Sequence, residues 1–233
     1  MARMGDGYGS ECHLLRFLGR HRRTLDQLIV KTVGADSVEW ADYPFDRSHP
    51  WLDGEHKGIS FIGDNESLQA AWRQFWPGSG NSQNWDAVGR VQVDGAWEWL
   101  LVEAKANLEE IRSSCQAKEH GGRPLISRTL AKTKSDLGVA PERDWLNRYY
   151  QFCNRVATLH FLEQNGIKTR IFLIYFCGDR SGEGRTCPSD AAGWDAALRG
   201  QDEHVGLPMG HPLSNRIHKG FLDVIPPESR DLL

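Results

Sequence analysis

The sequence predicts a mixed α/β domain, an α+β fold with a mixed sheet, and three segments carry that prediction. Two β-prone runs, 86–93 and 96–105, flank Asp94-Gly95, a dipeptide typical of two-residue hairpin turns. Apolar residues then recur at helical spacing over 144–165. The run 170–177 is almost wholly apolar, as expected of a strand covered on both faces. The order hairpin, helix, buried strand predicts a right-handed crossover from the second hairpin strand.

Further helices and strands are expected on both sides of these segments. Helical spacing of apolar residues predicts helices over 10–33 and 65–76 and two short ones around Trp194 and Ile217. Ser10 is the expected N-cap of the first helix, and Gly19 is the candidate break within it. Two β-prone pieces, 38–43 and 58–62, lie in a stretch rich in Asp, Pro, Gly and His. The polar, basic segment 106–143 is expected to hold short helices and a loop.

Length and composition favour one domain over 1–233 and exclude several classes of protein. With 233 residues and 39% apolar residues, the chain can bury one sizeable core. No apolar run approaches the roughly 20 residues of a membrane helix, and the N-terminus lacks a signal-like run. We therefore expect a cytoplasmic protein with no membrane partner. Five widely spaced cysteines are typical of reduced thiols, and the histidines show no zinc-binding spacing, so no structural zinc is expected.

Charge is segregated along the chain. The net charge of −3 argues against a protein that coats nucleic acid with its whole surface. Residues 35–104 hold 12 acidic and 4 basic side chains, whereas 112–134 hold 6 basic side chains and one acidic one. This is expected where a carboxylate-rich metal site lies beside a phosphate-binding flank, with Arg112 and Lys118 as candidate phosphate ligands. A solvated charged loop explains the same pattern equally well.

The end of the predicted hairpin carries a candidate site. A two-residue turn at Asp94-Gly95 places Asp86 opposite Glu103, with Lys105 on the same face. Two carboxylates about 5 Å apart repel by roughly 3 kcal/mol at an effective dielectric near 20, so a cation between them is expected. Oxygen ligands suit Mg²⁺ or Mn²⁺ better than zinc. Such a metal would polarise a phosphate oxygen, while Lys105 supports the developing charge or orients the attacking water.

The same three side chains also have simpler interpretations. Lys105 and one carboxylate could form an ordinary salt bridge, and a D/E-x-K triplet is expected about once in a chain of this length. Glu55-His56-Lys57 also matches E-x-K, but it lies in a loop-like stretch without a paired Asp, so we treat it as a decoy. Two carboxylates about 5 Å apart would also serve a glycosidase as acid and nucleophile. Lys105 and the basic segment after it argue against that activity.

The order of these residues resembles a known superfamily. Asp86, then Glu103-Ala104-Lys105 a strand later, then a helix and an apolar strand, looks like the PD-(D/E)XK nucleases, which have the restriction-endonuclease-like fold. The resemblance covers about 84–178. It implies an αβββαβ core with helices on both faces of the sheet and extra N- and C-terminal helices, which would leave 10–76 as an N-terminal helical part and 179–233 as a C-terminal extension.

The resemblance also implies roles for these residues. Asp86 and Glu103 would bind Mg²⁺ or Mn²⁺, the backbone carbonyl of Ala104 would also bind it, and Lys105 would assist hydrolysis. The proline of the motif's name is absent, because Asn84 and Trp85 precede Asp86. Such loss is common in this divergent group.

Members of the superfamily often add a Glu from the first helix and a polar residue from a later one. We favour Glu11 as the added metal ligand, with Glu66 and Glu55 left open, although helix-start acids are also common as dipole partners. Gln151 is the candidate polar residue. Arg155 lies one helical turn further on, so the two could reach a phosphate together. Two surface residues that bond each other are the simpler alternative.

These residues lead to the hypothesis of a metal-dependent nuclease that cuts phosphodiester bonds in nucleic acid, DNA more than RNA. The rival hypothesis is a non-catalytic module on the same fold that binds nucleic acid or a protein partner, in which Asp86, Glu103 and Lys105 only form ion pairs. The sequence leaves open whether the chain forms a homodimer.

Overall fold

The structure is a computed structural model that describes residues 7–41, 55–78, 83–180 and 184–225. A mixed five-stranded sheet, ordered β1-β4-β5-β6-β7, forms its centre. The first three strands in this order pair antiparallel, and β5, β6 and β7 run parallel. The five strands are β1 (Ser37–Trp40), β4 (Ala87–Val93), β5 (Ala96–Lys105), β6 (Thr169–Cys177) and β7 (Ile217–Asp223). A separate antiparallel pair joins β2 (His56–Lys57) to β3 (Asn84–Trp85).

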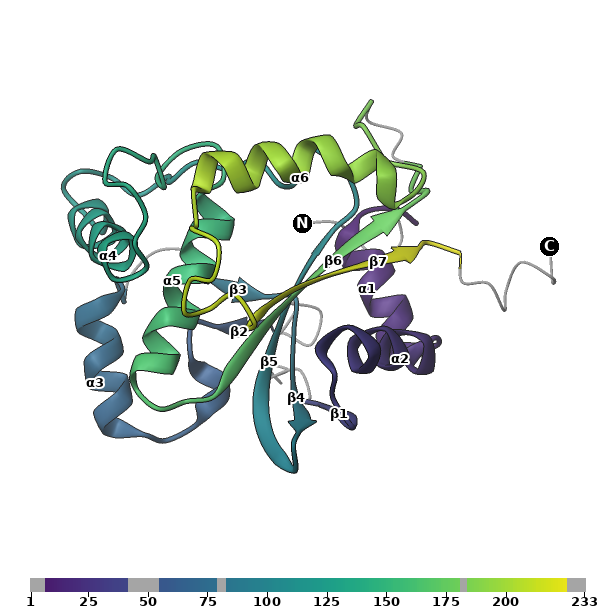
Figure 1. Cartoon of the computed structure of the whole chain (residues 1–233), viewed down its shortest axis with the longest axis horizontal. Coiled ribbons are helices and arrows are strands. Elements are labelled where there is room, and N and C mark those ends of the chain that lie inside the picture. The colour runs from purple at the N-terminus through teal and green to yellow at the C-terminus, as the bar shows by residue number, and fades with distance from the viewer. Residues whose placement is uncertain (1–6, 42–54, 79–82, 181–183, 226–233) are drawn as a thin grey trace, which may run out of the picture.

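Helices cover both faces of the sheet. The described residues form six α-helices: α1 (Ser10–Gly19), α2 (Arg22–Val33), α3 (Glu66–Phe75), α4 (Arg123–Asp136), α5 (Tyr150–Gln164) and α6 (Ala191–Val205). α1 and α2 bury their apolar side chains against one face, together with Val102 and Phe172 of the sheet. The other four helices share a second core with Leu101 and Leu173. Figure 1 shows α1 and α2 on one side of β4 and β5, and α3 and α5 on the other.

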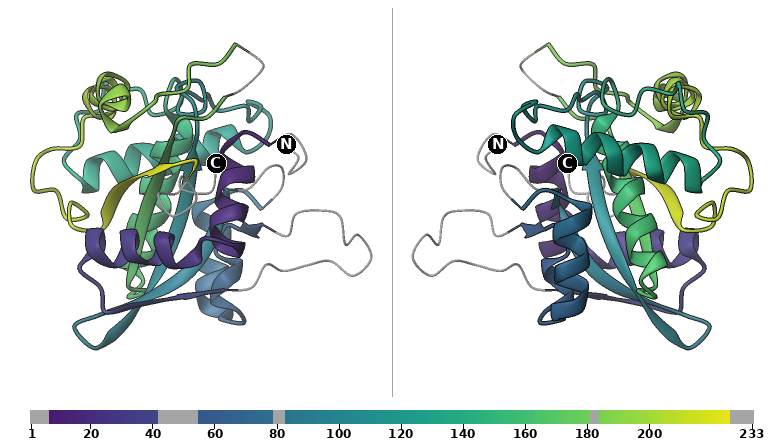
Figure 2. Two further views of the ribbon diagram at one scale, coloured as in Figure 1. Left: turned by 90° about the vertical axis from the view of Figure 1, so that its right-hand side faces the viewer. Right: turned by 90° about the vertical axis from the view of Figure 1, so that its left-hand side faces the viewer.

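The predicted hairpin is confirmed, and its turn fixes which end of the sheet holds the candidate site. Asp94 and Gly95 have φ values of 50° and 76°, the positive values that a type I′ turn requires of both residues. Pairing runs from Val93 with Ala96 to Ala87 with Val102, which is the predicted register. The side views show the turn projecting beyond the helices, so the far end of β5 lies nearer α6 (Figures 1 and 2).

The predicted buried strand and crossover helix are also present, but the bounds of the helix differ from the prediction. All nine residues of β6 are buried, and β6 pairs parallel with β5, as the predicted crossover requires. The helix, however, begins at Tyr150 and not at Asp144. Arg148 has a φ of 65°, outside the right-handed helical region, and the Asp144 carboxylate accepts bonds from the Leu146 and Asn147 amides. A turn stabilised by this side chain therefore replaces the first predicted helical residues.

Several other expectations need correction. Residues around Ile217 form β7 and not a helix, because they pair with β6, and Gly220 lets Phe172 approach to within 2.7 Å of where a Cβ would lie. The piece 58–62 holds a 3₁₀ turn at Ser60–Ile62 instead of a strand. The segment 106–143 contains one 14-residue helix, and α6 is a 15-residue helix rather than a short one.

The start and the division of the first predicted helix can be compared with the structure directly. The predicted helix 10–33 divides directly after Gly19, at the expected break. The N-cap is Gly9 and not Ser10, which is the first helical residue. The Gly9 amide donates to the buried Asp179 carboxylate at 3.0 Å, and this contact ties the start of α1 to the end of β6.

Two shorter predictions hold in part. Asn65 caps α3, and its side chain accepts a bond from the Leu68 amide, close to the predicted start at 65. The piece 38–43 overlaps β1, while residues 42 and 43 lie outside the described ranges. Among the helices placed in the structure, none has both the length and the apolar content to cross a bilayer.

Candidate functional site

Glu103 is a buried carboxylate held by two cations. It lies near the end of β5 and is 3% exposed. Lys105 Nζ donates to its Oε1 at 2.5 Å, and Arg155 Nε and Nη2 donate to its Oε2 at 2.9 and 2.8 Å. Burial alone would raise the pKa of Glu103, but the positive charges of Arg155 and Lys105 outweigh burial and lower the pKa. Glu103 is therefore ionised at neutral pH.

Asp86 lies beside this cluster, in a different position from the one expected. The β4–β5 ladder ends at Ala87 and Val102, so Asp86 is a bend residue between β3 and β4 rather than a strand residue opposite Glu103. Its amide N–H still donates to the Val102 carbonyl at 3.1 Å. Its Oδ2 accepts a bond from the Ala104 amide at 2.7 Å. The carboxylate thus reaches the middle residue of Glu103-Ala104-Lys105 from beyond the end of the ladder.

Asp86 and Glu103 nevertheless interact electrostatically. Burial, followed by the negative charge of Glu103, raises the pKa of Asp86 to about 8, against the opposing effects of Lys105 and the Ala104 amide. Burial would lower the pKa of Lys105, but Glu103 and Asp86 together raise it. Lys105 is therefore a cation, and Asp86 is largely protonated near neutral pH in the absence of a further positive charge.

Arg155 does not lie where a phosphate ligand was expected. It is 3% exposed, and its guanidinium lies over the Trp85 ring, 4.6 Å from the centroid. Besides Glu103, it contacts the Asn84 carbonyl and the Asn154 side-chain oxygen. Because these partners and the ring surround the guanidinium, Arg155 serves to hold Glu103 and is withdrawn from the surface that a phosphate would meet.

Glu11, the favoured third carboxylate, is not brought together with the others. It lies on α1, whose buried side chains pack on the face that carries Val102 and Ala104. Glu66 is exposed in the first turn of α3. Within the ranges that the structure describes, no three His, Cys, Asp or Glu side chains are grouped to hold a metal ion. Glu11 is therefore not grouped with Asp86 and Glu103 among the described residues, and its role as a metal ligand stays a prediction.

The triplet Glu55-His56-Lys57 lies closer to Asp86 than its loop-like sequence predicts. His56 and Lys57 form β2, which pairs with β3, so that His56 lies opposite Trp85 and Lys57 opposite Asn84. These two partners are the residues immediately before Asp86. No sequence pattern indicated this pairing, because strands of two residues carry no detectable periodicity.

The remaining predicted residues flank the cluster. Gln151, at the start of α5, lines a small cavity of about 20 Å³ together with Glu103, Lys105 and Arg155. Its backbone amide donates to Ser113 Oγ at 2.8 Å, which ties α5 to the loop after β5. Arg112 and Lys118 are exposed on that same loop, which leaves the sheet directly after Lys105.

The donor set fits a hard divalent cation. Asp86 and Glu103 supply carboxylate oxygens, and each oxygen has two lone pairs, so the bonds to Glu103 leave acceptor capacity. A strand residue directs its N–H and C=O to the same side, so the Ala104 carbonyl shares the side on which its amide meets Asp86. Burial and then the negative charge of Glu103 raise the pKa of Asp86, and a cation bound to its carboxylate would lower that pKa again.

Sequence reasoning missed the polar residues Tyr175 and Gln201 of this cavity and misjudged Arg155, and a signal was available for Gln201 and Arg155. Gln201 of α6 lines the cavity and is 2% exposed. It occupies the same helix stripe as the buried Trp194, Leu198 and Val205, so it is a polar residue at a core-facing position. Arg155 likewise falls among the buried residues of α5. A polar side chain on an apolar stripe was the available sign in both cases.

Comparisons with known proteins identify no relative of this chain. No protein-family model matches it, and neither a curated protein nor a solved structure matches it. The function is therefore inferred from the geometry of the site alone.

Proposed function

We propose that this protein is a metal-dependent nuclease of the restriction-endonuclease-like type, which hydrolyses phosphodiester bonds in nucleic acid, DNA rather than RNA. The observation that carries the proposal is the meeting of Asp86, Glu103 and Lys105 at the end of one hairpin. The succession α2, β1, β4, β5, α5, β6 is compatible with the αβββαβ order of that fold. Divalent cation and nucleic acid are the proposed cofactor and partner.

The charge of the cluster supports a phosphodiester ligand. With Asp86 protonated, the single ionised carboxylate of Glu103 faces two cations, Lys105 and Arg155. This leaves one net positive charge, which one phosphodiester group would neutralise. On the loop after β5, the exposed Arg112 and Lys118 lie among three acidic residues, Glu109, Glu110 and Glu119. A phosphate at this site would therefore be attracted by Lys105, because Arg155 is enclosed by its partners.

Each residue has a defined task in the proposed reaction. Asp86, Glu103 and the Ala104 carbonyl would hold Mg²⁺ or Mn²⁺, which when bound polarises phosphate and lowers the pKa of water. The Ala104 amide fixes the Asp86 carboxylate, and Arg155 fixes that of Glu103. Lys105 has three N–H donors, of which one is given to Glu103. Another can donate to a non-bridging phosphate oxygen, whose negative charge grows in the transition state.

A second candidate function, a non-catalytic binding module, is favoured by one observation. Both oxygens of Glu103 already accept bonds from cations, and a third carboxylate is not grouped with Asp86 and Glu103 among the described residues. Ion pairs alone therefore account for Glu103. They do not account for Asp86, whose burial next to Glu103 raises its pKa without any benefit to such a module.

A cleavage panel tests the nuclease proposal. Plasmid DNA and labelled DNA and RNA oligonucleotides would be incubated with Mg²⁺, Mn²⁺ or EDTA and the wild-type protein, Lys105→Met or Lys132→Met. Lys132 is the matched control, because it is an exposed lysine on α4 paired with Asp136. We expect metal-dependent cleavage by wild type and Lys132→Met, and a loss of about a hundredfold or more in Lys105→Met.

Three results would contradict parts of the proposal. Wild-type protein that cuts none of the substrates with either metal would favour the binding module. Cleavage by Lys105→Met at the wild-type rate would show that any activity arises elsewhere. Cleavage that persists in EDTA would show that the reaction needs no divalent metal.

A further inference from the structure

The cavity beside Glu103 has the size and lining of a site for one water molecule. Its volume is about 20 Å³, and a cavity needs roughly 10–15 Å³ of such volume to hold a water. Residues from β5, β6, α5 and α6 line it, among them Lys105, Gln151, Tyr175 and Gln201. A buried water needs two to four polar partners, and these four side chains end in amide, ammonium or hydroxyl groups.

An unsatisfied atom points to what the cavity holds. Gln201 is 2% exposed, and its side-chain Oε1 is buried without a hydrogen-bond partner among the described residues. Buried polar groups in folded proteins are nearly always bonded, to protein or to ordered water. Only two buried side-chain atoms in the described part of the chain lack a partner, and the other belongs to Arg16, on α1. The unmet acceptor thus belongs to a residue that lines the cavity beside the proposed catalytic lysine.

Donor and acceptor match across this cavity. Gln201 Oε1 needs a donor, and Lys105 Nζ has N–H groups beyond the one that it gives to Glu103. A water molecule can accept from Lys105 and donate to Gln201 at the same time. We infer that the cavity is a hydration site, in which one water bridges Gln201 to Lys105. Gln201 thereby acts as a positioning residue for the ammonium, and this role rests on the proposed nuclease function.

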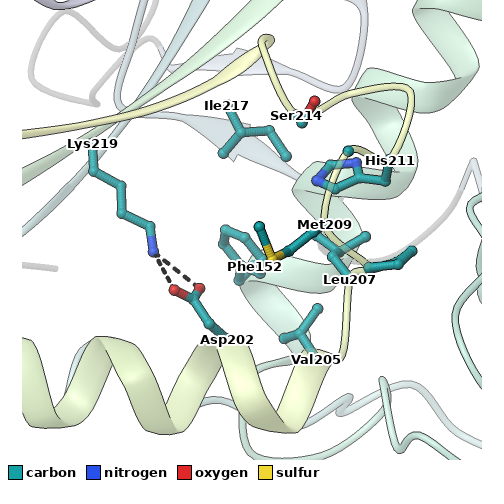
Figure 3. Close-up of a pocket in the computed structure, with 11 residues that line it drawn as sticks. Phe152, Asp202, Val205, Leu207, Met209, His211, Ser214, Ile217 and Lys219 are labelled. Atoms are coloured by element: carbon teal, nitrogen blue, oxygen red, sulfur yellow. Dashed lines mark hydrogen bonds and ion pairs between the residues drawn. The ribbon is translucent and has the colours of Figure 1, made fainter.

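The fold anchors Gln201 for such a role. The next residue on α6, Asp202, bonds Lys219 of β7 through both carboxylate oxygens, at 2.8 and 2.9 Å. Figure 3 shows this pair bordering a separate, larger pocket of about 300 Å³ between the end of α6 and β7. Trp194, on the same helix, donates to the Phe176 carbonyl at 3.3 Å. Ties to β6 and β7 therefore hold α6 against the sheet, with Gln201 facing the cavity.

The bridge has a consequence for the reaction. One Lys105 N–H is directed to Glu103, and the water fixes the direction of a second. The third is then left to donate to a phosphate oxygen in the proposed reaction. Loss of the bridge would free the ammonium to rotate, which lowers the rate of the chemical step more than substrate binding.

The test uses Gln201→Met, which has a similar shape but no hydrogen-bonding amide, and Gln164→Met as the matched control. Gln164 is exposed at the end of α5, so the same replacement there leaves the cavity intact. Crystal structures of all three proteins would locate the water, thermal unfolding would give Tm, and steady-state cleavage would give kcat and KM. Neither of the first two measurements requires the protein to be a nuclease.

We expect a water within about 2.7–3.2 Å of both Gln201 Oε1 and Lys105 Nζ in wild type and Gln164→Met. Gln201→Met should lose this water and lower Tm, with kcat reduced about ten- to a hundredfold and KM nearly unchanged. A dry wild-type cavity, or a higher Tm in Gln201→Met, would overturn the hydration site, because removing an unsatisfied amide stabilises a protein.

The two proposals fail separately. A bridging water and a lowered Tm, with an unchanged kcat in Gln201→Met, would refute the positioning role alone. If wild type shows the water but cuts no substrate, the hydration site stands and the nuclease function fails.

Discussion

Strand β5 carries two buried carboxylates, Glu98 and Glu103, and each is held by two cations. Glu98 accepts from Arg170 at 2.5 Å and from Arg216 at 2.6 Å, much as Glu103 accepts from Arg155 and Lys105. Positive neighbours lower the pKa of both carboxylates against the effect of burial. A carboxylate between two cations is therefore not by itself evidence of a functional site in this protein.

What distinguishes the Glu103 end is an additional carboxylic acid with a raised pKa. Asp86 is half-buried near Glu103, and desolvation and that negative charge raise its pKa to about 8. At the Glu98 end a further carboxylate, Glu163, lies 3.9 Å from Arg216 Nε, and burial and then Arg170 lower the pKa of His218 to about 4. Asp86, and not the ion pairs of Glu103, therefore marks the candidate site.

The largest expected effect is on stability, and it should be similar at the Glu103 and Glu98 ends of β5. Arg155→Met and Arg170→Met each leave a buried carboxylate with one cation fewer, and we expect each to lower the free energy of unfolding by about 3–5 kcal/mol. Urea denaturation followed by circular dichroism measures both. A loss below about 1 kcal/mol at Arg155 would mean that Glu103 does not need its guanidinium partner.

The cleavage rate should distinguish the Glu103 end of β5 from the Glu98 end. Glu103→Gln removes a proposed metal ligand, so we expect its cleavage rate to fall by about a hundredfold or more at a temperature where the protein is folded. Glu98→Gln is the matched change at the other end of β5, and its rate should stay within about threefold of wild type. Equal losses in the two variants would show that the rate follows stability and that the Glu103 end has no special role.

A smaller and pH-dependent effect is expected from Asp86→Asn in metal-free buffer with EDTA. The folded-state pKa of Asp86 lies above its ordinary value of 3.8, so its contribution is most favourable below about pH 4 and is lost as pH rises through about 8. Asparagine does not titrate and can still accept the Ala104 N–H bond. The Tm of Asp86→Asn should therefore exceed that of wild type by an amount that grows between pH 5 and 9, by about 2–4 °C per kcal/mol.

Thermal unfolding over that pH range measures the difference. A difference that stays flat, or shrinks as pH rises, would mean that Asp86 is ionised without cost in the folded protein. Asp86 would then not have a raised pKa in the metal-free protein.

Much of the fold followed from local sequence signals. The Asp94-Gly95 turn, the register of β4 with β5, and the buried strand β6 could be predicted because turn chemistry and periodicity act over a few residues. β7 could not be predicted in this way. Its seven residues alternate weakly, and they form a strand because β6 offers them a parallel edge and Gly220 admits Phe172.

The candidate site shows the same division between local and distant signals. Glu103 and Lys105 could be placed on one face because they lie two residues apart on a strand. The ladder ended one pair earlier than expected, so the position of Asp86 depended on its side chain and on β3. Arg155 and Gln201 reach the cavity from α5 and α6, whose packing no short-range pattern specifies.

Calorimetric titration with Mn²⁺ tests the central claim most directly, because it measures whether Asp86 is part of a metal site. Wild type and Glu98→Gln should both release heat on binding, whereas Asp86→Ala should not. The affinity of wild type should rise from pH 6.5 to pH 9, since Mn²⁺ displaces the Asp86 proton. No heat in wild type, or equal heat in Asp86→Ala, would contradict a metal site at Asp86 and Glu103.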